Sequence, residues 1–116
     1  DEYVLDSAEL AQVKQRTAEF NTIIRQAVDA RNTNGKRLAH VDMFTFLNRA
    51  QTGVTAGTAT IRMEIPFGGA VSLDGIHPTP KGYALFANEF IKAINETFGS
   101  TVPPVDPNRY RGNVIP

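Results

Sequence analysis

The amino-acid sequence predicts an α/β fold and, more narrowly, half of an α/β domain. In residues 6–31 and 80–98, apolar residues recur at three- and four-residue steps, which is the spacing of amphipathic helices. Residues 37–43 and 61–67 have the apolar or alternating composition of short strands. Because sheets of globular domains usually contain about five or six strands, two strands are too few for a complete α/β domain.

Residues 6–31 are predicted to form the first helix. Asp6 and Ser7 are both good N-cap residues, and Asp6 with Glu9 has the spacing of a capping box. The apolar positions on one helix face are Leu10, Val13, Phe20, Ile23, Ile24, Ala27 and Val28. We expect this face to pack on a sheet, and we expect the turn residues 31–36 (RNTNGK) to end the helix.

The segment between the two long helices is predicted to contain short elements. Residues 37–43 (RLAHVDM) are expected to form a buried strand, because they include three apolar positions and follow a helix and a turn. Residues 44–50 can form one or two helical turns, and residues 51–60 (QTGVTAGTAT) are expected to be a loop of small and polar residues. Residues 61–67 are expected to be a short strand or extended arm that stops at Pro66 and the glycines after it.

The second long helix is predicted to begin after Thr79, an N-cap residue, with Pro80 at the first helical position, where its missing N–H costs nothing. Gly99 has the position of a C-terminal cap residue. The apolar stripe of this helix consists of Tyr83, Phe86, Ala87, Phe90, Ile91, Ile94 and Phe98. Residues 101–116 hold four of the seven prolines, and we expect them to form an extended tail on the surface of a body made by residues 1–100.

Charge and composition exclude several classes of function. The chain has 12 Lys and Arg against 12 Asp and Glu, so its formal net charge is zero and it offers no electrostatic attraction for nucleic acid or an anionic membrane. The chain has no cysteine, which excludes a disulfide, a thiolate metal site and a cysteine nucleophile. The apolar runs are too short to span a bilayer. We therefore expect no nucleic-acid partner.

One short motif carries candidate catalytic chemistry, the tetrad 74–77 (DGIH) that precedes the second helix. It can be a polar turn that caps the helix, or it can be an acid–base pair. In the second case the carboxylate of Asp74 holds Nδ1–H of His77, which leaves Nε2 free to take a proton from a hydroxyl group. Gly75 permits a sharp bend, and Pro78 keeps His77 outside the helix.

A metal site explains the same residues less well. One histidine and one aspartate supply too few ligands for a protein-bound metal. The chain's other histidine, His40, is accompanied only by Asp42 as a residue of ligand type. We therefore expect neither a metal nor a cofactor.

The stretch SLDGIHPTPKGYALFANEFIKAIN, residues 72–95, resembles the last conserved block of the SGNH/GDSL hydrolases, the GDSL-like lipases, acylhydrolases and esterases. The matching positions are Asp74, His77, Pro78, Gly82, Tyr83, Ala87 and Asn88. The upstream stretches DEYVLDSAEL, FNTIIRQAV and LAHVDMFTFLN also resemble the family, so that the resemblance covers roughly residues 1–100. It implies an α/β fold that is the C-terminal half of a flavodoxin-like three-layer α/β/α domain. It also implies that His77 is the general base of a serine esterase and that Asp74 orients it.

The resemblance also identifies what this chain lacks. The family's nucleophile is the Ser of a Gly-Asp-Ser motif, and its oxyanion hole uses a Gly and the Asn of a Gly-x-Asn-Asp motif, but neither motif occurs here. The three serines are poor substitutes, because Ser7 is suited to capping a helix, Ser72 lacks a strand-to-helix elbow, and Ser100 follows the last helix. The chain also begins without Met at a point that falls inside the family pattern. We therefore expect a C-terminal fragment of a bacterial ester hydrolase that is inactive alone.

The expected partners follow from this interpretation. They are a small-molecule, carbohydrate or lipid ester as the substrate and the missing N-terminal part of the same protein. An incomplete α/β domain can also associate with copies of itself through its exposed strands. The alternative function is a binding or interaction module in which the Asp-x-x-His motif is vestigial. The resemblance is compatible with a secreted or periplasmic bacterial protein.

Overall fold

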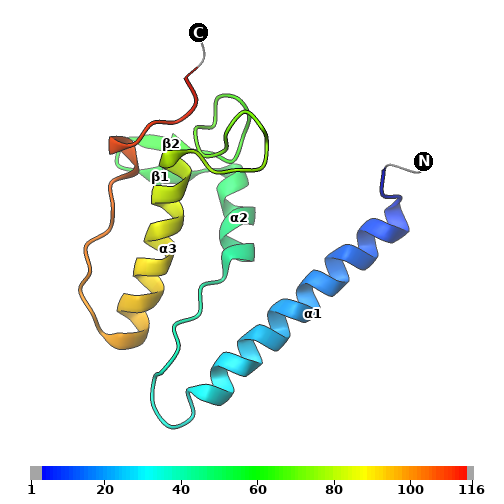
Figure 1. The fold of residues 1–116 in the computed structure, drawn as a ribbon, viewed down its shortest axis with the longest axis vertical. Coiled ribbons are helices and arrows are strands. Elements are labelled where there is room, and N and C mark those ends of the chain that lie inside the picture. The colour runs from blue at the N-terminus through cyan, green and yellow to red at the C-terminus, as the bar shows by residue number, and fades with distance from the viewer. Residues whose placement is uncertain (1–3, 115–116) are drawn as a thin grey trace. The chain divides into compact units, whose positions relative to one another are not determined.

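A computed structural model describes residues 4–114 of the chain. The chain divides into two compact units, Asp1–His40 and Val41–Pro116. The elements are α1 (Ser7–Arg31), α2 (Met43–Thr52), β1 (Val54–Ala56), β2 (Ala59–Ile61), α3 (Pro80–Phe98) and a 3-10 helix (Pro107–Arg109), all drawn in Figure 1. Helices are thus combined with one small antiparallel sheet, which is compatible with the predicted α/β class.

The first unit contains α1, and the predicted first helix is confirmed with its capping box. Oδ1 of Asp6 accepts hydrogen bonds from the amides of Ala8 and Glu9, both at 2.8 Å. In return, Oε2 of Glu9 accepts from the amide of Asp6 at 2.9 Å. These bonds satisfy amide donors that have no partner inside the helix, and therefore they fix where α1 begins.

The apolar face of α1 has no sheet to pack on within its own unit. None of the residues of α1 is buried, and residues 4–40 contain no strand. The predicted packing of this helix on a sheet is therefore not formed by the first unit. The large exposed side chains of the face are Leu10, Val13, Phe20, Ile23 and Ile24.

The predicted strand at residues 37–43 is wrong. Residues 37–42 have no regular secondary structure, and Met43 is already the first residue of α2. Asp42 caps this helix, because its Oδ1 accepts from the amide of Thr45 at 3.0 Å and its Oδ2 accepts from the Thr45 hydroxyl at 2.9 Å. A strand needs a neighbour to pair its backbone groups, whereas a helix cap needs only residues nearby in sequence. The short helix predicted at residues 44–50 is confirmed as part of α2.

The predicted loop at residues 51–60 is wrong in part, because it contains most of a β-hairpin. Strands β1 and β2 pair in antiparallel register with Val54 opposite Ile61, and a two-residue turn joins them. Gly57 begins this turn with φ 62°, a left-handed conformation that glycine adopts without strain. The strand predicted at residues 61–67 reaches only Ile61, and beyond it Arg62 forms an isolated bridge with Gly69.

The core of the second unit lies between α2, α3 and the hairpin. The buried cluster consists of Phe46, Ala50, Ile61, Ala70 and Leu85. Helices α2 and α3 lie side by side (Figure 1), with the rings of Phe46 and Phe86 packed edge to face at 5.6 Å. A 2.6 Å ion pair between Arg49 and Glu89 joins the same two helices.

Helix α3 is confirmed with its predicted caps. Thr79 is buried, and its Oγ1 accepts from the amide of Gly82 at 3.1 Å and donates to the carbonyl of Gly69 at 2.6 Å. At the other end Gly99 has φ 67°, as a C-terminal cap residue should. None of the helices within residues 4–114 is long and apolar enough to cross a membrane.

The C-terminal tail is held on α3 by two asparagine side chains. The amide group of Asn88 both donates to and accepts from the backbone of Val105, at 2.8 and 2.7 Å. Asn95 makes the same pair of bonds with Val102, at 2.9 and 3.0 Å. The two asparagines are seven residues apart on α3, which is a rise of about 10.5 Å. Their partners are three residues apart in the tail, which is about 9.3 Å of extended chain, so the two distances nearly match. The division into a body and a tail at residue 100 stays a prediction.

Gly82 is the residue at which helix α3 approaches the preceding segment most closely. A Cβ atom at this position would lie 2.0 Å from the carbonyl oxygen of Ala70, which is backbone and cannot move aside. We expect Gly82→Ala to lower the free energy of unfolding by about 1–3 kcal/mol through overpacking, as measured by chemical denaturation. Gly99→Ala is the control, because no atom lies within 4 Å of its Cβ and only its positive φ opposes the substitution. An equal or larger loss at Gly99 would contradict the steric explanation.

Candidate active site

The tetrad 74–77 lies in a tight loop of residues 72–77, the dyad loop, which is named after the pair Asp74 and His77. The loop is closed by an isolated bridge between Val71 and Pro78 and by a hydrogen bond from the amide of Ser72 to the carbonyl of His77 at 2.8 Å. Inside it, the amide of Gly75 donates to the carbonyl of Ser72 at 3.0 Å, and Gly75 has φ 77°. The left-handed conformation explains the glycine, because side chains disfavour it.

The dyad loop brings Asp74 and His77 together. Nδ1 of His77 lies 2.7 Å from Oδ2 of Asp74. The other carboxylate oxygen, Oδ1, accepts three hydrogen bonds: from the hydroxyl of Ser72 at 2.6 Å and from the amides of Ile76 and His77 at 2.9 Å each. The three donors on Oδ1 fix the rotation of the carboxylate, so Oδ2 points at the imidazole ring.

These hydrogen bonds hold the pKa of the Asp74 carboxyl well below its ordinary value of 3.8. The hydroxyl of Ser72 contributes most, followed by the amides of Ile76 and His77 and then by the His77 ring. Each donor favours the charged carboxylate over the neutral acid. Asp74 is therefore ionised throughout the neutral range and can stabilise a protonated imidazole.

The dyad is accessible to solvent. The side chain of His77 is 71% exposed and that of Asp74 is 49% exposed. Among residues 4–114, no hydrogen-bond partner occupies Nε2 of His77. Because exposed contacts of this kind usually add little to stability, stability alone is a weak explanation for the contact between Asp74 and the His77 ring. The ring is held at one nitrogen and open at the other, which is the arrangement that a general base requires.

Ser72 is the site residue whose role was missed in the sequence. Its lack of a strand-to-helix elbow argued against a nucleophile, and in the structure its hydroxyl instead donates to Asp74. A hydroxyl two residues before an aspartate in a turn is the only local signal for such support. Asn113 was also missed, since its contacts with the backbone of residues 66 and 71 are distant in sequence.

The described residues give no metal centre. Within the range 4–114, no group of three or more His, Cys, Asp and Glu side chains is placed to hold an ion. The carboxylate of Asp42, the companion of His40 in the sequence, is used as the cap of α2.

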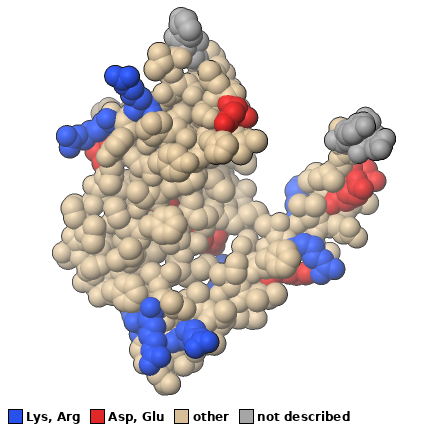
Figure 2. All heavy atoms as spheres, in the orientation of Figure 1, with Lys and Arg blue, Asp and Glu red and all other residues tan. Residues whose placement is uncertain are grey.

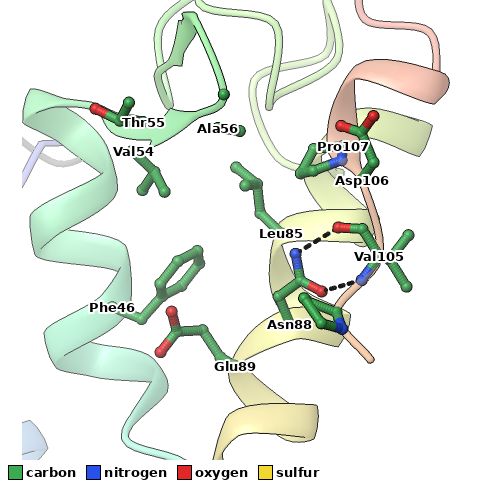
Figure 3. A pocket seen from close by; sticks show the side chains of 12 residues that line it. Phe46, Val54, Thr55, Ala56, Leu85, Asn88, Glu89, Val105, Asp106 and Pro107 are labelled. Carbon is green, nitrogen blue, oxygen red and sulfur yellow. Dashed lines mark hydrogen bonds between the residues drawn. The ribbon is translucent and has the colours of Figure 1, made fainter. Parts of the chain in front are cut away.

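A pocket of about 280 Å³ lies elsewhere in the second unit, between the hairpin, α3 and the tail. Figure 3 shows the side chains of Phe46, Val54 and Leu85 converging on it, with the Asn88 bonds to Val105 along one wall. Neither Asp74 nor His77 lines this pocket. It is therefore not the place where the dyad would meet a substrate.

Figure 2 shows no continuous basic area among the described residues on the face of the molecule that it presents. That face is largely uncharged, with Lys and Arg side chains in small separate groups. The even balance of charge over the whole sequence agrees with this view.

Comparison with known proteins gives one family. The model of the family described as GDSL-like Lipase/Acylhydrolase matches residues 2–90. This range includes the dyad loop and stops within α3, so the tail lies outside it. Neither the curated proteins nor the solved structures contain a match to the chain.

The low pKa of Asp74 predicts an effect of pH on stability. A carboxyl whose pKa is depressed in the folded state stabilises the fold above its unfolded pKa, and the stabilisation is lost as the pH falls through the folded value. We therefore expect thermal unfolding of the wild type to show a fall in stability below about pH 4 that is smaller in Asp74→Asn. Ser72→Ala, which removes the strongest donor, should show an intermediate fall. Equal pH dependence in all three proteins would contradict the low pKa.

Proposed function

The chain belongs to the GDSL-like lipase/acylhydrolase family, and from this premise we propose that it carries the acid–base half of a serine ester hydrolase. The observation that supports this most is the 2.7 Å contact between Nδ1 of His77 and Asp74 beside an Nε2 with no partner among residues 4–114. Family membership supports hydrolysis, and the contact supports the roles of the two residues.

In the proposed mechanism, Nε2 of His77 removes the proton from a serine hydroxyl as its oxygen attacks the ester carbonyl. The imidazolium that forms is stabilised by the ionised carboxylate of Asp74, which also keeps the proton of the neutral ring on Nδ1. His77 then gives its proton to the departing alcohol, which leaves an acyl-enzyme. A water molecule releases the acid in the second half, with His77 acting first as base and then as acid.

We propose that the nucleophile comes from polypeptide outside residues 1–116. In the structure the Ser72 hydroxyl donates to Asp74, and the Ser100 hydroxyl donates to Oδ1 of Asn95 at 2.9 Å. Ser7 lies in the first turn of α1, where Asp6 is the N-cap. The N-terminal part of the same protein would then supply the serine and the oxyanion donors. This partner would also complete a flavodoxin-like three-layer α/β/α domain, of which the present chain would be the C-terminal half.

The exposed apolar face of α1 supports the same proposal. A helix that leaves Phe20 and Ile23 more than half exposed needs a covering surface. The missing strands would provide it, and a second copy of the chain is the other occupant. Light scattering of residues 1–116 distinguishes the two, because a chain that stays monomeric at high concentration does not cover the α1 face with a second copy.

The proposed substrate is an ester of a small molecule, a carbohydrate or a lipid. The dyad takes part in proton transfer, which is common to all three classes. The choice among them depends on pockets around the nucleophile. The alternative function is an interaction module with a vestigial dyad, in which the exposed α1 face would bind a partner.

The test of the proposed function uses the full-length protein and a chromogenic ester. We expect His77→Ala to lower kcat/KM by about 10³-fold or more, because proton transfer from the serine is lost. His40→Ala is the matched control, since it removes the only other histidine of residues 1–116, and it should keep the wild-type rate. A His77→Ala variant with near wild-type turnover, or a wild type that hydrolyses no ester, would favour the interaction module.

A further inference from the structure

We infer that Asn113, in the C-terminal tail, is a positioning residue that holds the dyad loop in its productive geometry. The inference rests on the proposed role of Asp74 and His77. It concerns a segment that the family match does not include, because that match ends at residue 90. The support would therefore be a feature of this chain beyond the family pattern.

The side chain of Asn113 reaches the segment that enters the dyad loop. Its Nδ2 donates to the carbonyl of Pro66 at 3.0 Å and to the carbonyl of Val71 at 2.8 Å, and both bonds are partly buried. Val71 directly precedes Ser72, the residue whose hydroxyl bonds to Asp74. A single amide group thus ties two points of the entering segment together.

The tail also holds the segment that leaves the dyad loop. The amide of Lys81, in the first turn of α3, donates to the carbonyl of Arg111 at 3.0 Å. This amide is one of the donors at a helix start that have no partner inside the helix. Between the two attachments Gly112 lies so close to Gly69 that an added Cβ would be 3.1 Å from its carbonyl oxygen. Residues 111–113 therefore hold both ends of the dyad loop.

External support matters here because the dyad loop is exposed. The bonds within it bridge no more than five residues, and water competes with exposed bonds of this kind. Small errors in position are costly in catalysis, since a displacement of about 1 Å can reduce the rate about 100-fold. Attachment to the tail, which Asn88 and Asn95 fix along α3, connects the dyad loop to a regular helix.

The test measures the tautomer of the His77 ring by ¹⁵N NMR of residues 1–116 at a pH where the ring is neutral. Asp74 should hold the proton on Nδ1 in the wild type. In Asn113→Ala we expect a several-fold larger share of the Nε2–H tautomer. The ring of His40, in the other unit, is the internal reference and should not change.

Asn108→Ala is the matched control variant. Asn108 is another tail asparagine, and its Nδ2 donates to the carbonyl of Ala56 at 2.8 Å, in the hairpin. We expect this variant to keep the wild-type tautomer of His77. Asn113→Ser, which replaces the amide donor with a hydroxyl donor, is the second variant if the alanine variant does not fold, and it should show a smaller change than alanine. An unchanged His77 ring in the folded Asn113 variants, or an equal change in Asn108→Ala, would overturn the inference.

Kinetics of the full-length protein separate this inference from the proposed function. We expect Asn113→Ala to lower kcat by up to about 100-fold with little change in KM, because positioning rather than substrate binding is lost. The NMR test needs no turnover, so an inactive wild type with a tail-dependent tautomer would reject only the proposed function. An active enzyme whose kcat is unaffected by Asn113→Ala would reject only the role of Asn113.

Discussion

The carboxylate of Asp74 is the group on which the candidate site depends. It accepts four hydrogen bonds, three on Oδ1 and one on Oδ2, and every donor comes from residues 72–77. The fold of the loop and the orientation of the His77 ring are therefore set by the same interactions. A substitution that changes the orientation of the Asp74 carboxylate would therefore also change the orientation of the His77 ring.

The body of the second unit serves this loop mainly by fixing its two ends. Thr79 and Gly82 place the start of α3 against the backbone of Gly69 and Ala70, on the way into the loop. The tail adds contacts on both sides through Arg111 and Asn113. The core beneath is small, with five residues in its buried cluster. A local hydrogen-bonded loop is well suited to such a body, because it requires little buried apolar surface.

Features that depend on neighbouring residues could be predicted from the sequence. The capping box of α1 and the caps of α3 at Thr79 and Gly99 rest on chemistry within a few positions. The pairing of Asp74 with His77 is of the same kind, since three positions and a glycine bring them together. The family match to residues 2–90 agrees with the resemblance on which their roles were predicted.

Features that depend on distant partners could not be predicted in this way. Residues 37–42 have a strand-like composition, but the structure gives them no pairing partner and the cap at Asp42 leads into a helix. The hairpin at residues 54–61 was not predicted, because its small residues are typical of loops. The contacts of Asn113 join positions more than 40 residues apart and leave no local pattern.

The most direct test of the account is to find whether His77 activates a serine, and which one. A fluorophosphonate probe applied to the full-length protein, followed by peptide mass spectrometry, identifies the labelled residue. The account predicts a label on a serine outside residues 1–116, at a rate that falls sharply in His77→Ala. A label on Ser72, or a labelling rate that does not depend on His77, would contradict it.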